Sequence, residues 1–232
     1  MNEHALWPGG PVYEGDAVSA DSLALADFAR VNAVRRAADL GCGCGILMLL
    51  LAFGQRSLAV DGVEIRPGAA AQCRKNLEIN ALTDRCAVVQ ADLRAGALSA
   101  ESYELVVTNP PYFSPGRGRV SPDGERARMR TESATLAELS AAAAALLIPG
   151  GRFCLVHRME RKAELFRALE KAGLSPVRFR ELRSRQERPG RVFLLESRKG
   201  ESSPLREEPP LCQYGPDGTE TAEYRKICHW EA

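Results

Sequence analysis

A carboxamide, two prolines and an aromatic ring stand together at Asn109-Pro110-Pro111-Tyr112, directly after the apolar run Leu105-Val106-Val107. The side-chain oxygen of Asn109 and the carbonyl of Pro110 can each accept a hydrogen bond. The prolines restrict the backbone and so hold these acceptors in place, and Tyr112 offers a ring for stacking. The segment predicts a site for a planar amino group, although by itself it could also be a rigid surface turn.

Methyl transfer to an amino nitrogen is a reaction that such a site can perform. The nitrogen lone pair of adenine or of an amide is delocalised, and acceptors for both N–H groups draw the nitrogen toward tetrahedral geometry. Preorganised acceptors and alignment of the reactants would supply most of the acceleration. No strong base is needed, because the protonated product is very acidic. The candidate catalytic residues are Asn109, Pro110, Pro111 and Tyr112.

An acid and closely spaced glycines form a second candidate site in the run Asp39-Leu40-Gly41-Cys42-Gly43-Cys44-Gly45. Glycine lets the backbone turn tightly and approach a ligand closely. Glu64 ends a second predicted strand, where a carboxylate can accept both hydroxyls of a ribose. Asp92 follows a third strand and can accept from an adenine amino group. The candidate donor-binding residues are Asp39, Gly41, Gly43, Gly45, Glu64 and Asp92.

Simpler explanations exist for the glycine run, which taken alone also fits a plain turn. The pair Cys42 and Cys44 has the wrong spacing for the usual zinc ligands, and no histidine or second cysteine pair accompanies it. The three histidines are scattered along the chain. We therefore predict no metal site.

Strands alternate with helices, which predicts an α/β fold with a mostly parallel, seven-stranded sheet and helices on both faces. The predicted strands are 36–40, 58–64, 86–90, 103–107, 152–157, 177–182 and 191–196. The predicted helices are 21–31, with Asp21 as its cap, then 46–53, 67–80, 131–147 and 159–172. The last two strands lack a helix between them and predict an antiparallel edge. In such a sheet the acidic strand ends meet at one edge.

The organisation expected from this pattern has three parts. Residues 1–34 form a loop and a helix that cover the donor pocket, and residues 35–197 form the core. Residues 198–232 form an extension packed on the core; rich in Pro and Glu, it is expected to be irregular or wrapped on the surface.

Composition limits the function classes. The seven cysteines are odd in number and irregularly spaced, which fits the reducing cytoplasm. No apolar run approaches membrane-spanning length, and no signal peptide is visible, so we expect no membrane partner. The formal net charge is +1, so any binding of nucleic acid must rest on local clusters.

Two arginine clusters could meet RNA. One lies in residues 113–131, and the other holds six arginines in residues 178–191. Solvated surface charge is the simple interpretation; the alternative is a pair of positive surfaces that follow a phosphate backbone beside the site. The candidate RNA-binding residues are Arg117, Arg119, Arg126, Arg128, Arg130 and Arg188.

These motifs resemble known families. The glycine run after an acid resembles motif I of class I S-adenosylmethionine-dependent methyltransferases, and Asn-Pro-Pro-Tyr is the motif of enzymes that methylate adenine N6, guanine N2 or glutamine N5. The segments that look like the bacterial tRNA(Val) adenine-N6 methyltransferase family are Trp7–Pro11, Asp21–Ala29, Asn109–Phe113 and Arg188–Glu196. This resemblance covers most of the chain and is weakest in residues 197–232.

The resemblance implies a Rossmann-like fold, S-adenosylmethionine as cofactor and tRNA as partner. It implies that residues 109–112 hold an adenine beside the anticodon of a tRNA(Val), and that Asp21 faces the donor pocket.

Three alternatives stay open. Glutamine-N5 enzymes resemble this core preceded by a helical domain, whereas only about 35 residues precede the glycine run here. Guanine-N2 enzymes more often carry Phe in place of Tyr112 and a duplicated domain. An RNA-binding adaptor would be expected to have lost the asparagine or the glycines. We expect a monomer.

Overall fold

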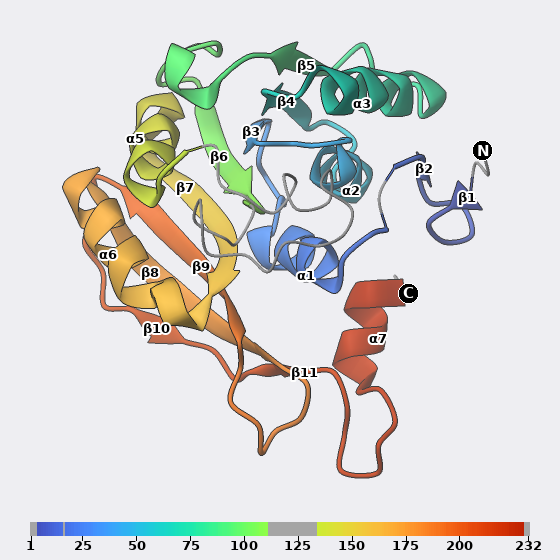
Figure 1. Ribbon diagram of the computed structural model, residues 1–232, viewed down its shortest axis with the longest axis vertical. Helices are drawn as coiled ribbons and strands as arrows, with labels where there is room; N and C mark the ends of the chain where they lie inside the picture. Colours follow the sequence, from blue (N-terminus) through green and yellow to red (C-terminus); the bar gives the residue numbers. More distant parts are fainter. Residues whose placement is uncertain (1–3, 16, 111–133, 230–232) are drawn as a thin grey trace, which may run out of the picture.

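A single large sheet forms the centre of the computed structural model, which describes residues 4–15, 17–110 and 134–229 (Figure 1). Its strands are β3 (Arg36–Leu40), β4 (Ala59–Glu64), β5 (Cys86–Gln90), β6 (Tyr103–Thr108), β7 (Leu147–Arg158), β8 (Leu174–Arg183), β9 (Val192–Lys199), β10 (Arg206–Glu207) and β11 (Leu211–Cys212). They lie in the order β10-β8-β9-β7-β6-β3-β4-β5, and β11 also pairs with β8. A separate two-stranded hairpin joins β1 (His4–Ala5) to β2 (Val12–Tyr13).

The sheet is mostly parallel, as predicted. Strand β3 runs parallel to β4 and β6, β4 to β5, and β6 to β7. The antiparallel pairs are confined to one side of the sheet, where β9 runs opposite to both β7 and β8. Strand β9 thus lies one position inside β8, because the turn between them folds the later strand back against β7.

Helices cover both faces, which also confirms the prediction. They are α1 (Ala20–Ala29), α2 (Ile46–Gly54), α3 (Pro67–Ile79), α5 (Leu136–Leu146), α6 (Lys162–Lys171) and α7 (Ala222–His229), with the 3-10 turns η1 (Leu93–Ala95) and η2 (Met159–Arg161). Helices α1, α2, α3 and α7 share one hydrophobic core, and α5 and α6 share the other. Strand β6 serves both, because Leu105 and Val107 enter the first core and Val106 the second. None of the described helices is long and apolar enough to span a membrane.

Two local predictions were wrong. The cap of α1 is Ser19, whose hydroxyl accepts from the backbone N–H of Ser22 at 3.2 Å, and not Asp21. The C-terminal segment, expected to be irregular or wrapped on the surface, contains the regular elements β10, β11 and α7. Strands β10 and β11 pair with the outer side of β8. Such short strands exist only through that partner, about 30 residues earlier in the chain, so local propensity does not show them.

Candidate active site at the carboxyl edge of the sheet

The carboxyl ends of β3 and β6 lie side by side where the order of the strands reverses (Figure 1). Ligands of open α/β sheets bind at such a switch point. The buried hydroxyl of Thr108 donates to the carbonyl of Leu40 at 2.7 Å and ties the two strand ends together. Asn109 therefore follows β6 directly beside the loop that begins at Gly41.

The glycine loop needs its glycines. Gly41, Gly43 and Gly45 have φ angles of +74°, +57° and +89°, values that side-chain-bearing residues rarely adopt. A Cβ on Gly45 would lie 2.6 Å from the sulfur of Cys73, so even alanine does not fit. Helix α2 starts immediately after Gly45 and points its N-terminus at the loop, an arrangement that suits an anionic or polar ligand group.

Glu64 holds this loop in shape. One of its oxygens accepts from the backbone N–H of Gly43 at 2.8 Å, and the other from the backbone and Nε of Arg66 at 2.9 and 3.0 Å. A carboxylate offers about four lone-pair positions, so these contacts leave about one. Glu64 can accept both ribose hydroxyls only if it releases one of these hydrogen bonds. The bond from the Arg66 side chain is the one that can be released, because this side chain is 43% exposed and can move.

Asp39 is a buried carboxyl group without a hydrogen-bond partner in the described part of the chain. It is 1% exposed, and neither side-chain oxygen is satisfied. Burial, reinforced by the charge of Glu64, raises the pKa of Asp39 to about 8. Unsatisfied buried groups concentrate at functional sites, and a cationic group of a ligand would satisfy this one.

We expect the affinity for S-adenosylmethionine to depend on pH through Asp39. Because the pKa of this carboxyl is about 8, the free protein keeps it protonated at pH 6. A cationic group bound beside it favours the ionised form, so binding releases a proton. Affinity should rise by up to about tenfold per pH unit below pH 8 and level off above it. Calorimetric titration from pH 6 to 9 checks this, with Asp39→Asn as the flat control; a flat wild-type profile would refute it.

Asp92 caps η1 and is engaged by Arg94. Its oxygens accept from the backbone N–H of Arg94 at 2.9 Å and from Nε at 2.9 Å and Nη2 at 2.5 Å. These hydrogen bonds lower the pKa of Asp92 to about 2, so the carboxylate stays ionised. About one lone-pair position remains for a further donor, enough for one N–H of an adenine amino group.

Asn109 is held by a residue that the sequence did not single out. Its side-chain nitrogen donates to the hydroxyl of Ser22 in α1 at 2.9 Å, and that hydroxyl lies 3.1 Å from the hydroxyl of Ser19. An amide whose nitrogen is held presents its oxygen on the other side. The orientation of the Asn109 acceptor is thus set by α1. Pro110 is described, whereas Pro111 and Tyr112 lie outside the described residues.

We expect Ser22→Ala to lower kcat by about 2- to 12-fold, the value of one neutral hydrogen bond. Donor affinity should be unchanged, because only the orientation of Asn109 is loosened. Ser22→Thr keeps a hydroxyl and should restore most of the rate. Steady-state kinetics and donor titration of both variants check this. If Ser22→Ala loses thermal stability but no kcat, the contact is structural only.

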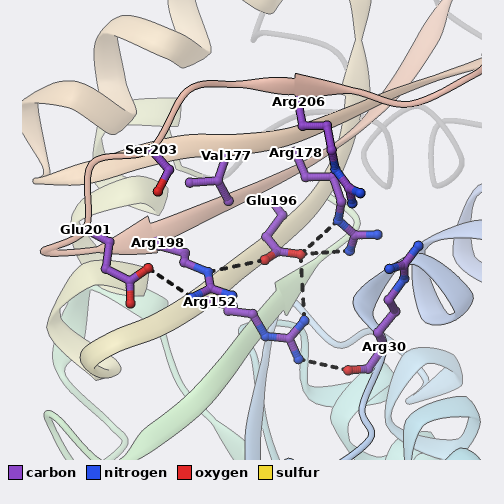
Figure 2. Close-up of a pocket in the computed structure, with 9 residues that line it drawn as sticks. All are labelled: Arg30, Arg152, Val177, Arg178, Glu196, Arg198, Glu201, Ser203 and Arg206. Atoms are coloured by element: carbon purple, nitrogen blue, oxygen red, sulfur yellow. Dashed lines mark hydrogen bonds and ion pairs between the residues drawn. The ribbon is translucent and has the colours of Figure 1, made fainter.

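Helix α1 is itself anchored at its other end by a buried charge cluster (Figure 2). Glu196 accepts from Arg178 at 2.7 and 3.0 Å and lies 3.7 Å from Arg152. Arg178 stacks on the ring of Phe28 at 3.6 Å and donates to its carbonyl, and Arg152 donates to the carbonyls of Ala29 and Arg30 at 2.8 and 2.9 Å. These arginines satisfy carbonyls that a helix end leaves open, and they fix the position of α1.

The N-terminal segment is attached to the glycine loop by Asn76, a second residue that sequence reasoning missed. Its fully buried side chain donates to the carbonyls of Glu14 and Cys44, both at 2.8 Å, and accepts from the backbone N–H of Glu14 at 3.1 Å. One turn later Asn80 makes the same paired contacts with Val12. Two asparagines four residues apart, on a helix face with Cys73, were the available signal.

The arginines divide into two groups. Arg117, Arg119, Arg126, Arg128 and Arg130 lie outside the described residues. Of the six between 178 and 191, four bind the protein itself: Arg178 with Glu196, Arg180 with Glu223, Arg183 with Glu181, and Arg185 with the carbonyl of Gly215. These four arginines are therefore engaged within the protein, and the contact of this stretch with RNA stays a prediction for Arg188. Arg188 and Arg191 are exposed and have no ion pair among the described residues.

The described residues contain no group of three or more His, Cys, Asp or Glu side chains that could hold a metal ion. Cys42 is buried, and a Cβ on Gly62 would approach its sulfur to 2.7 Å. It packs against β4 as a small apolar residue.

Fold and site together define a class of protein. A family model described as the methyltransferase small domain matches residues 7–174. A solved structure from Agrobacterium tumefaciens, described as a predicted O-methyltransferase, aligns with a TM-score of 0.71 at 20% identity, over 90% of this chain and 95% of that one. That likeness shows a shared fold, and the family match shows a methyltransferase.

Two proteins of similar sequence indicate to which family of methyltransferases the chain belongs. A protein of Tolumonas auensis named tRNA1(Val) (adenine(37)-N6)-methyltransferase is 34% identical over 213 residues, 89% of this chain and 86% of its own length. A Yersinia pestis protein of the same name is 35% identical over 67% of this chain and 63% of its own length. The chain belongs to this family, as the resemblance implied.

Proposed function

We propose that the protein transfers a methyl group from S-adenosylmethionine to N6 of an adenine in tRNA, at position 37 of a tRNA(Val) as in the names of its relatives. The observation that carries this is the position of Asn109. Its amide follows β6 at the switch point, its strand is tied to the glycine loop by Thr108, and Ser22 sets its orientation. A tRNA substrate also favours the cytoplasm, and a monomer is the form that we propose.

The donor fits the residues beside Asn109. The unsatisfied Asp39, the open space above Gly41 and the remaining acceptor positions of Glu64 and Asp92 form one polar cradle at the strand ends. We assign Asp39, Gly41, Gly43, Gly45, Glu64 and Asp92 to donor binding. When bound, S-adenosylmethionine supplies a methyl group on a positively charged sulfur.

The chain contributes positioning and hydrogen-bond acceptance. Asn109 Oδ1 and the Pro110 carbonyl accept the two N–H groups of the adenine and draw its nitrogen toward tetrahedral geometry. Because Ser22 orients the amide before substrate arrives, this acceptance costs little reorganisation. Tyr112 gives the base a ring on which to stack. Water can take the proton that the methylated nitrogen loses, so none of these residues has to act as a base.

Mass spectrometry of nucleosides tests the proposal. The protein is incubated with S-adenosylmethionine that carries a deuterated methyl group and, separately, with unmodified tRNA, ribosomal RNA and release factor. We expect deuterated N6-methyladenosine in tRNA. Label in protein alone would favour glutamine-N5 transfer, and 2-methylguanosine would favour guanine. No transfer together with tight RNA binding would favour an adaptor, and any of these three results overturns the proposal.

A further inference from the structure

A pocket of about 590 Å³ opens at the catalytic edge of the sheet, between α1, the turn from β8 to β9 and the C-terminal segment. Ala20, Asp21 and Ala24 of α1 form one wall. The turn contributes Arg188 and Arg191 among others. Its volume lies in the range of small-molecule sites. Among the described residues, none of those assigned above to the donor or to the adenine lines this pocket.

The pocket adjoins the candidate catalytic asparagine. Asp21 lines it, and the next residue, Ser22, holds the amide of Asn109 at 2.9 Å. Because Asp21 and Ser22 are consecutive residues of α1, the pocket and the amide border the same turn of this helix. A ligand in the pocket can therefore be part of the same substrate molecule as the group bound at Asn109.

The charge of the pocket favours an anion. The described lining residues include three arginines and a single acid, Asp21. Arg183 forms an ion pair with Glu181 at 2.6 Å, whereas the exposed Arg188 and Arg191 have no ion pair in the described part of the chain. The neighbouring arginines from 178 to 185 are all engaged, so these two guanidinium groups stand out as available for a phosphate.

An aromatic ring and apolar side chains complete the pocket. Tyr224 of α7 lines it, together with Leu182, Val192 and Leu211. Helix α7 lies beside α1 (Figure 1), and its Ile227 enters the same core. The C-terminal segment thus supplies a surface on which a planar base can stack.

We propose that this pocket takes an unpaired nucleotide next to the target adenine, with its phosphate on Arg188 and Arg191 and its base against Tyr224. The inference rests on the proposed function and extends it to the C-terminal segment, which becomes part of the substrate site. Bases read in single-stranded RNA are splayed out and stacked on aromatic rings in this way.

Paired variants test the pocket. Arg188→Ala/Arg191→Ala should weaken tRNA binding and reduce the slope of log K against log salt by about 1.4, the value for two lost contacts on single strands. The matched control is Arg30→Ala/Arg206→Ala, which removes two arginines of similar exposure, 61% and 62%, from the pocket of Figure 2. Tyr224→Ala should weaken binding by about 5- to 150-fold, and Tyr224→Phe should not.

The outcomes separate this inference from the proposed function. Donor affinity and the melting temperature of the double variant should match those of the wild type, because both arginines are exposed. If the wild type methylates adenine in tRNA but the two double variants share one salt slope, the pocket proposal fails alone. If the wild type methylates no RNA, the proposed function fails first. Equal binding by Tyr224→Ala and the wild type would also overturn the stacking role.

Discussion

Asn109→Ala should lower the rate of methyl transfer by about 100-fold or more and leave donor binding nearly intact. Loss of one preorganised polar contact to the reacting group has this effect in other enzymes. The loss falls on kcat because Asn109 Oδ1 acts on the amino group of the substrate and lies outside the donor cradle. Single-turnover kinetics with saturating donor measure the chemical step, and calorimetry measures donor affinity.

A matched substitution controls for the loss of an asparagine. Asn32 is exposed in the turn after α1, at the opposite edge of the sheet, and Asn32→Ala should change the rate by less than about twofold. If Asn109→Ala weakens donor binding as much as it slows transfer, the amide holds the loop together and does not act on the substrate.

Glu196→Ala should destabilise the folded protein by about 3–5 kcal/mol, the cost of removing one partner of a buried ion pair. Glu196 and Arg178 are 5% and 4% exposed, and their side chains meet at 2.7 Å (Figure 2). Without the carboxylate, the guanidinium of Arg178 stays buried against Phe28 and keeps, among the described residues, only the more distant Glu208 at 3.6 Å as a countercharge. Urea unfolding at equilibrium, monitored by circular dichroism, gives the difference in free energy of unfolding.

The control lies in the same pocket. Glu201 pairs with Arg198 at 2.9 Å, but its side chain is 44% exposed, so Glu201→Ala should cost less than about 1 kcal/mol. Glu196→Gln keeps the shape of the side chain and one acceptor oxygen. Its loss of stability should therefore lie between those of Glu196→Ala and Glu201→Ala. Equal losses for Glu196→Ala and Glu201→Ala would show that solvent reaches Arg178 and that the cluster does not anchor α1.

The two predictions are linked through α1. The charge cluster holds the C-terminal end of this helix, and Ser22 near its other end holds Asn109. A residual folded fraction of Glu196→Ala should therefore also show a reduced kcat, because a displaced α1 no longer orients the amide.

Much of the architecture was accessible from local patterns. The alternation of strands and helices, the apolar run before Asn109 and the glycines after Asp39 reflect backbone and burial preferences within a few residues. These preferences predicted the parallel sheet and its two helical faces, and the resemblance of the motifs implied the methyltransferase family; all three are confirmed. The assignment of individual residues to donor and adenine stays a prediction.

Partner choice was not accessible in the same way. Arg178 and Arg188 belong to one arginine-rich stretch, yet one is buried on Glu196 and Phe28 and the other is exposed. Ser22 looks like an ordinary residue of a helical turn until β6 brings Asn109 to it from 87 positions away. The sequence by itself determined the class of fold and the chemistry at the strand ends, because both depend on short-range geometry. Only the tertiary structure decided which charged side chains form ion pairs within the protein and which helix orients the amide of Asn109. Those contacts join segments that are distant in the sequence and meet only in the folded chain.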